Sequence, residues 1–171
     1  KQRLDALLAA RSLLPEGPLQ VWAQGEWTEV NFLETEIYGE SEDHHSPEVQ
    51  KLAEDGFEAL NTNKGKKAKE LFAKALKIEP NAPDLLFNFA AAHILEGQND
   101  EGRKIIEKLH ADNPDYVFAS VYAAKHQAEE GRFEEAEKKF AELSKRKRLH
   151  FSEHFAIYSG LAEIQIRHGD F

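Results

Sequence analysis

The feature that most constrains this chain is a spacing of 34 residues at which the same residue types recur. Pro80 and Pro114 have this spacing, and so do Gly97 and Gly131. Further columns keep it: Phe72, Ile106 and Phe140; Ala68, Gly102 and Ala136; and Ala75, Leu109 and Leu143. Because several independent columns share one period, the sequence predicts a repeated supersecondary unit and hence a repeat architecture.

Each unit is predicted to contain two helices. Ser46 precedes Pro47, which is typical of a helix N-cap followed by proline in the first turn. An apolar stripe at helical spacing follows, then a break at residues 63–65, and then a second stripe that ends before Pro80. Small residues recur where the paired helices would approach closely, at Gly56, Ala90 and Ala124. A single pair cannot bury both of its apolar faces, so the pairs are expected to stack into an α-solenoid.

The pattern resembles the tetratricopeptide repeat family, in which large apolar, small, aromatic and proline positions follow one another within 34 residues. The resemblance covers residues 48–171. It implies an all-α fold, an α-α superhelix of about three and a half helix-turn-helix repeats. The units would span 48–82, 83–116, 117–150 and, in part, 151–171.

The match to the family pattern is incomplete in places. Asp55 stands at a usually apolar position, and Arg148 stands where proline is expected. Beyond Arg148 the register slips by four residues. We therefore expect the last helix at about Phe155 to His168, with Tyr158, Leu161 and Ala162 in the apolar columns.

Residues 1–47 form a chemically different part, predicted to consist of an N-terminal helix, an irregular acidic segment and a linker. They hold three basic and nine acidic residues. Residues 1–14 predict an amphipathic helix, because leucines recur along one helical face. Residues 19–40 leave two alternatives open: a short acidic helix from Thr28 to Tyr38, or a small hairpin that turns at Gly25-Glu26. Residues 40–47 are predicted to be a polar linker, in which His44 and His45 are expected to be solvated.

The resemblance also implies a function. Proteins of this family are mostly scaffolds whose first helices line a concave groove that receives peptides or helices of partners. In this chain the expected groove is unusually apolar, because the helix around Phe87 and Phe89 is apolar nearly all round. The candidate partner-binding residues are Phe57, Leu60, Phe87, Asn88, Ala91, Phe118, Val121, Tyr122 and Lys125.

Three occupants could cover such an apolar surface. They are the chain's own residues 19–40, a partner peptide or amphipathic helix, and a second copy or further repeats. The C-terminal carboxylates of chaperone tails, which some family members bind, are not expected here. Of the basic and asparagine side chains that such binding uses, only Asn88 is present at the required positions.

Composition narrows the function classes. The chain has 171 residues, no cysteine and a net charge of −9. Nucleic acid is therefore not expected as the main partner, because phosphate binding needs clustered lysine and arginine. No apolar run is long enough to span a membrane. A cytoplasmic, non-catalytic protein without cofactor or metal is predicted. Because it begins at Lys1 and contains no methionine, we expect it to be a piece of a longer protein.

One motif supports a different function. His150, Glu153 and His154 fit the H-x-x-E-H pattern of inverted zinc peptidases, in which two histidines hold zinc and the glutamate activates water. The alternative for these residues is the capped start of a helix. A zinc-dependent hydrolase fragment and a regulatory domain of a larger enzyme thus remain alternatives to the scaffold.

Overall fold

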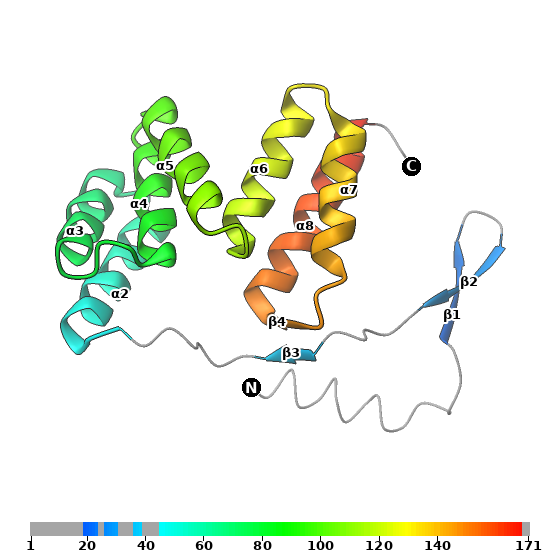
Figure 1. The fold of residues 1–171 in the computed structure, drawn as a ribbon, viewed down its shortest axis with the longest axis horizontal. Helices are drawn as coiled ribbons and strands as arrows, with labels where there is room; N and C mark the ends of the chain where they lie inside the picture. The colour runs from blue at the N-terminus through cyan, green and yellow to red at the C-terminus, as the bar shows by residue number, and fades with distance from the viewer. Residues whose placement is uncertain (1–18, 24–25, 31–35, 39–44, 169–171) are drawn as a thin grey trace.

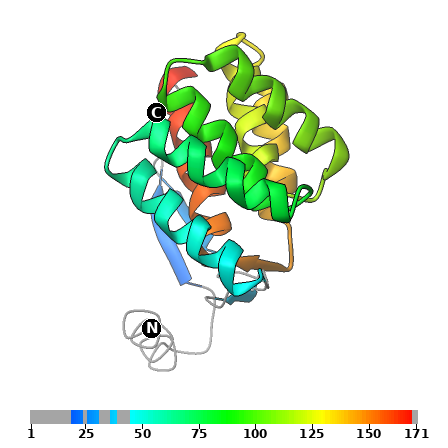
Figure 2. The ribbon, with the colours of Figure 1, turned by 90° about the vertical axis from the view of Figure 1, so that its left-hand side faces the viewer.

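The structure is a computed structural model that describes residues 19–23, 26–30, 36–38 and 45–168. Its described part is dominated by helices that stack as neighbouring pairs (Figure 1). They are α2 (Pro47–Asn61), α3 (Gly65–Ile78), α4 (Pro83–Leu95), α5 (Asn99–Asp112), α6 (Val117–Glu129), α7 (Phe133–Ser144) and α8 (Phe151–His168). Viewed from the side of α2 and α3, the helices of successive pairs lie next to one another (Figure 2). The predicted all-α superhelix is confirmed.

The turn inside each pair repeats in atomic detail. Among the described residues, Asn63, Gly97 and Gly131 have positive φ, at 57°, 75° and 82°. Their spacing of 34 residues places them at the same point of three consecutive units. After each one, the next amide donates to a carbonyl five residues back, as Gln98 N does to His93 O at 2.9 Å. Glycine and asparagine tolerate this left-handed conformation, which ends the first helix and starts the second.

The columns found in the sequence form the core. Phe72, Ile106 and Phe140 are at most 2% exposed, and Ala68, Gly102 and Ala136 are buried as well. The small residues allow close approach, as predicted. A Cβ on Gly56 would lie 2.7 Å from the Phe72 ring, and a Cβ on Gly102 would lie 2.8 Å from the Ala90 carbonyl oxygen.

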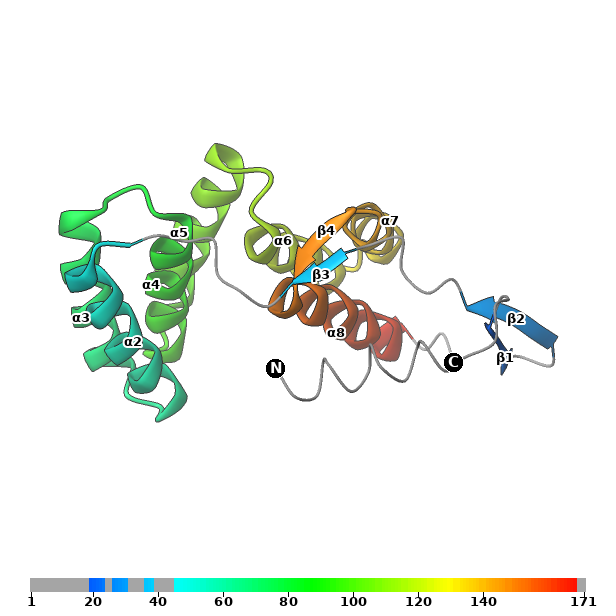
Figure 3. The ribbon, with the colours of Figure 1, turned by 90° about the horizontal axis from the view of Figure 1, so that it is seen from below.

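Short strands join the N-terminal part to the last helices. β3 (Glu36–Tyr38) pairs in parallel with β4 (Arg148–His150), with Ile37 opposite Leu149. Seen from below, the two strands lie side by side next to α6, α7 and α8 (Figure 3). β4 occupies the connection between α7 and α8, where the family pattern would place proline.

The insertion before α8 changes two expectations. The helix begins at Phe151 rather than near Phe155, because part of the inserted sequence forms its first turn. Its buried stripe consists of Ile157, Gly160 and Ile164. The expected columns at Tyr158 and Ala162 are exposed instead, because α8 packs against α6 and α7 with its other side.

Two antiparallel strands, β1 (Leu19–Ala23) and β2 (Glu26–Val30), resolve the ambiguity in the N-terminal part. Trp22 stands opposite Trp27 in their register. The hairpin alternative is therefore confirmed, and the acidic helix from residue 28 and the irregular segment are wrong at these residues. The helix predicted for residues 1–14 lies outside the described residues.

His45 contradicts its expected solvation. Its Nδ1 lies 2.5 Å from Glu79 Oε2 and its Nε2 lies 2.9 Å from Asp84 Oδ2. Burial alone would lower the pKa of His45, but the hydrogen bonds to Asp84 and Glu79 outweigh it and raise the pKa. The same contact lowers the pKa of Glu79. His45, which directly precedes the Ser46 N-cap of α2, thus binds both the end of α3 and the start of α4.

Candidate partner-binding site

Phe87, Tyr116 and Phe118 form a group of rings at the N-terminal ends of α4 and α6, here called the aromatic cluster. The ring centroids of Phe87 and Phe118 are 5.8 Å apart, and those of Phe87 and Tyr116 are 6.0 Å apart. The Tyr116 and Phe118 rings complete the triangle at 5.6 Å. All three side chains are half-buried, so each ring keeps part of its surface accessible.

Phe57 and Leu60 lie in a different place from the aromatic cluster. The Phe57 ring, 44% exposed, packs edge-on against Phe72 of α3 at 5.8 Å. Leu60 is half-buried against the same core, between α2 and α3. The structure thus brings together two of the three predicted phenylalanines, Phe87 and Phe118, and leaves Phe57 with its own helix pair.

Several predicted residues serve the fold. Asn88 is 9% exposed and its Nδ2 donates to the Asp84 carbonyl at 2.7 Å. Val121 is buried in the core that includes Ile157 and Ile164 of α8. Ala91 is half-buried.

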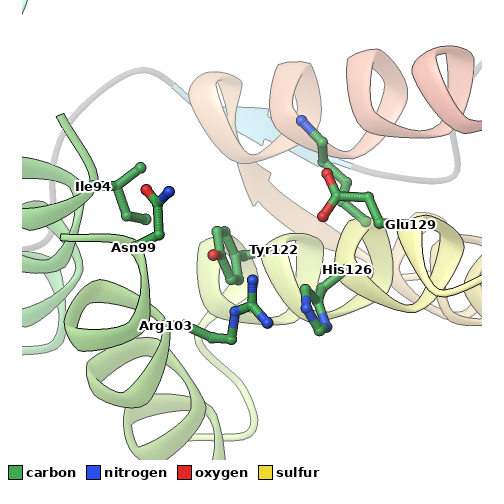
Figure 4. Close-up of a pocket in the computed structure, with 7 residues that line it drawn as sticks. Ile94, Asn99, Arg103, Tyr122, His126 and Glu129 are labelled. Carbon is green, nitrogen blue, oxygen red and sulfur yellow. The ribbon is translucent and has the colours of Figure 1, made fainter. Parts of the chain in front are cut away.

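A cleft of about 320 Å³ opens between the C-terminal half of α6 and the α4–α5 pair. We call it the α5–α6 cleft. Tyr122, His126 and Glu129 line it from α6, while Arg103 extends from α5 toward Tyr122 and His126 (Figure 4). The remaining lining residues are Ile94, Asn99 and Lys125. Tyr122 and Ile94 of the cleft pack against the same core as Phe87 and Tyr116 of the aromatic cluster.

Ion pairs occupy the side of the cleft that faces α8. Lys125 Nζ lies 2.6 Å from Glu163 Oε2, and this hydrogen bond is the main cause that lowers the pKa of Glu163. Glu129 Oε1 lies 3.6 Å from Arg167 Nη1. Lys125, a candidate partner-binding residue, thus already has an acidic partner within the chain.

The family model of the tetratricopeptide repeat matches residues 59–128, which run from the end of α2 to the end of α6. Residues 59–128 are a tetratricopeptide repeat segment. Among solved structures, the chain is similar to the Sgt2 TPR domain from Aspergillus fumigatus, with a TM-score of 0.55 and 23% sequence identity. The match covers 77% of this chain and 86% of that chain. No curated protein sequence matches significantly.

Tetratricopeptide repeats are typically non-catalytic modules for protein interaction, and stacked repeats create extended concave surfaces. The tetratricopeptide repeat segment contains Phe87, Tyr116, Phe118 and most of the α5–α6 cleft. None of the described helices is long and apolar enough to cross a bilayer.

The H-x-x-E-H residues form a helix cap. The backbone N of His150 donates to Glu153 Oε2 at 2.8 Å, while His150 Nδ1 accepts from Ser152 N at 3.3 Å. This reciprocal arrangement satisfies amides at the start of α8. Burial lowers the pKa of His154. Within residues 45–168 no group of three histidine, aspartate or glutamate side chains is arranged to hold a metal ion.

The sequence did not reveal three residues of the site. Arg103 and Asn99 lie on α5, a second helix, whereas the family resemblance directs attention to first helices. Tyr116 precedes α6 and belongs to no repeated column. Their contribution depends on how α5 and α6 are placed, and no spacing along the chain reports that.

Proposed function

We propose that this chain is a non-catalytic scaffold that binds a peptide or amphipathic helix of a partner protein across the aromatic cluster. The observation that carries the proposal is the meeting of Phe87, Tyr116 and Phe118, within 6.0 Å of one another, with all three rings still partly accessible. Aromatic side chains are enriched at interfaces because they bury a large area at little cost in conformational entropy.

The size of the effect supports binding. Full burial of a phenylalanine side chain is worth about 1.5–3 kcal/mol. Since Phe87 and Phe118 keep at most about a third of their surface exposed, covering them would add up to about 1 kcal/mol each. Tyr122, which continues the surface toward the α5–α6 cleft, would add to this contact.

An external partner is favoured over the chain's own residues 19–40. The part of that segment described against the repeats, β3, pairs with β4 and contacts α8. Its pairing partner Leu149 is buried in the core of the last three helices, away from the core that contains Phe87. A second copy of the chain remains a further possible occupant, which the oligomeric state would reveal.

The test is affinity capture with the full chain and two matched variants. Phe87→Asp places a charge in the aromatic cluster, while Ile78→Asp places the same charge on an isolated exposed side chain at the end of α3. We expect proteins bound by the wild type to be retained by Ile78→Asp and lost by Phe87→Asp. Equal helical content by circular dichroism would establish that both variants fold.

Identical sets of captured proteins for both variants would contradict the proposal. Size-exclusion chromatography with light scattering on the same samples distinguishes a partner from a second copy. A wild-type dimer that becomes monomeric only in Phe87→Asp would identify the second copy as the occupant.

A further inference from the structure

Arg103 is a charged residue that lines the α5–α6 cleft and has a buried nitrogen without a hydrogen-bond partner among the described residues. It lies on α5, is half-buried, and points across the α5–α6 cleft toward Tyr122 and His126 (Figure 4). Its Nε is buried and has no hydrogen-bond partner in the part of the chain that the structure describes. A guanidinium is always charged in proteins, and a buried N–H of a charged group without an acceptor is costly. Because Nε is closed to solvent, an acceptor in the cleft would be met by the terminal N–H groups of Arg103, at the end of the side chain that extends toward Tyr122 and His126.

The neighbouring charges of the cleft are already compensated. Lys125 is paired with Glu163, and Glu129 lies within ion-pair distance of Arg167. His126 Nδ1 lies 3.8 Å from Glu130 Oε1, and Glu130 in turn binds Arg132. Among residues 45–168 no carboxylate lies within 4.0 Å of the Arg103 guanidinium. The cleft thus presents one guanidinium that forms no ion pair within 4.0 Å among the described residues and interacts with Glu130 only at longer range.

The other lining groups favour a carboxylate. The planar guanidinium presents parallel N–H groups that match the two oxygens of a carboxylate. Tyr122 and Asn99 add a hydroxyl and an amide, which can donate further hydrogen bonds. Ile94 supplies an apolar wall for the methylene groups of an acidic side chain. The volume of about 320 Å³ is at the lower end of ligand pockets, which suits a side chain rather than a large ligand.

We infer that the α5–α6 cleft binds the carboxylate of an aspartate or glutamate side chain on the partner segment that covers the aromatic cluster. The inference rests on the proposed function, because Ile94 and Tyr122 of the cleft and Phe87 and Tyr116 of the cluster pack against one core between α4, α5 and α6. The inference predicts the sequence of the partner segment, which should contain an acidic residue next to apolar residues. The site differs from the chaperone-tail arrangement, whose positions the sequence does not fill, because its charge comes from a second helix.

The first experiment selects binders from a random dodecapeptide library displayed on phage, with the full chain as target. We expect peptides selected on the wild type to be enriched in both apolar and acidic residues. Peptides selected on Arg103→Gln should lose the acidic enrichment and keep the apolar one. Lys104→Gln, which removes an equal charge from an exposed neighbour on α5, should behave as the wild type. Recovery of no peptides, or of peptides without acidic enrichment on the wild type, would overturn the inference.

The second experiment measures the coupling directly. The best wild-type peptide is synthesised with its glutamate or aspartate and with the corresponding amide, and each is titrated by calorimetry. Arg103→Gln should weaken the acidic peptide about 10- to 100-fold, as expected for a hydrogen-bonded charge pair. It should leave the amide peptide unchanged. Equal weakening of both peptides, or equal effects of Arg103→Gln and Lys104→Gln, would refute the pairing.

Failure of the inference and failure of the proposed function give different results. If Phe87→Asp abolishes binding and Arg103→Gln behaves as Lys104→Gln, the aromatic surface stands and the acidic subsite is wrong. If Arg103→Gln weakens binding and Phe87→Asp does not, the cleft binds carboxylates without the proposed aromatic surface, and the inference in its stated form is overturned.

Discussion

Gly102 offers a sharp test of how the second helix pair is packed. It lies in α5 with its Cα against α4, and a Cβ built on it would lie 2.8 Å from the Ala90 carbonyl oxygen and 2.6 Å from Ile94 Cγ1. The Ile94 side chain can move, but the Ala90 carbonyl belongs to the α4 backbone and can move only with the helix. The change Gly102→Ala is therefore expected to push α4 and α5 apart.

The magnitude follows from two opposing effects. Overpacking by one methyl group in a well-packed core costs about 1–3 kcal/mol, and a gap of about 0.5–1 Å forfeits a quarter to a half of the contact energy at an interface. Alanine is favoured over glycine inside a helix by about 0.5–1 kcal/mol, which offsets part of that cost. We expect Gly102→Ala to lower the free energy of unfolding by about 1–2 kcal/mol. For a chain of this size the melting temperature would fall by about 2–8 °C.

The assay is urea unfolding of the full chain followed by far-UV circular dichroism. Ala141→Gly, at an exposed position of α7, is the control, because it measures the helix-propensity effect without a packing change. We expect Ala141→Gly to lose about 0.5–1 kcal/mol. A gain in stability for Gly102→Ala of the size that Ala141→Gly loses would refute the close approach of α4 and α5.

Three further predictions concern the ends of the repeat array. Because the pKa of His45 is raised in the folded chain, its contacts with Glu79 and Asp84 stabilise the fold fully below the ordinary value of 6.5 and are lost as the pH rises through the higher folded pKa. The stability difference between wild type and His45→Gln should therefore shrink from pH 6 to pH 9 in thermal melts, and a constant difference would contradict this. Glu153→Ala should lower the free energy of unfolding by about 0.5–1 kcal/mol, because it removes the carboxylate that accepts a hydrogen bond from His150 N. The same thermal melts measure this change. Elemental analysis of the wild type should find no stoichiometric zinc, and one zinc per chain would contradict the capping role.

The regular part of the fold could be predicted because its causes are local. Pro47 and the Ser46 side chain start α2, and Ser46 Oγ accepts from Val49 N at 3.4 Å as the sequence indicated. Gly97 and Gly131 end helices because they adopt positive φ. Such constraints act within a few residues, so a repeating pattern reports them directly.

Where the 34-residue repeat is interrupted or absent, the sequence predicted helix bounds and side-chain contacts less accurately. Where the register slips by four residues near Arg148, the chain forms β4 and begins α8 early, and strand β3 from more than a hundred residues away pairs with β4. His45 was expected to be solvated, yet its partners Glu79 and Asp84 lie more than thirty residues along the chain. A contact across such a distance leaves no periodic signal.

Some residues of the candidate site could likewise be predicted from the sequence and others could not. Phe87 and Phe118 could be predicted, because each lies at a first-helix position that the family resemblance assigns to the groove, although the two positions within the repeat differ. Phe57 lies at a third such position in the first unit but packs against Phe72, since each unit's surroundings depend on its neighbours. Arg103 could not be singled out from the other basic residues of α5, because only the position of α6 distinguishes it.

By itself, the sequence determined the helical pairs, their turns and the residues of their shared core, since these depend on side-chain volume, backbone conformation and helical spacing within one or two units. The tertiary structure alone decided which side chains remain accessible and which charges remain uncompensated. Both properties depend on the positions of helices that are distant in the chain, and burial and electrostatic pairing act through space rather than along the sequence.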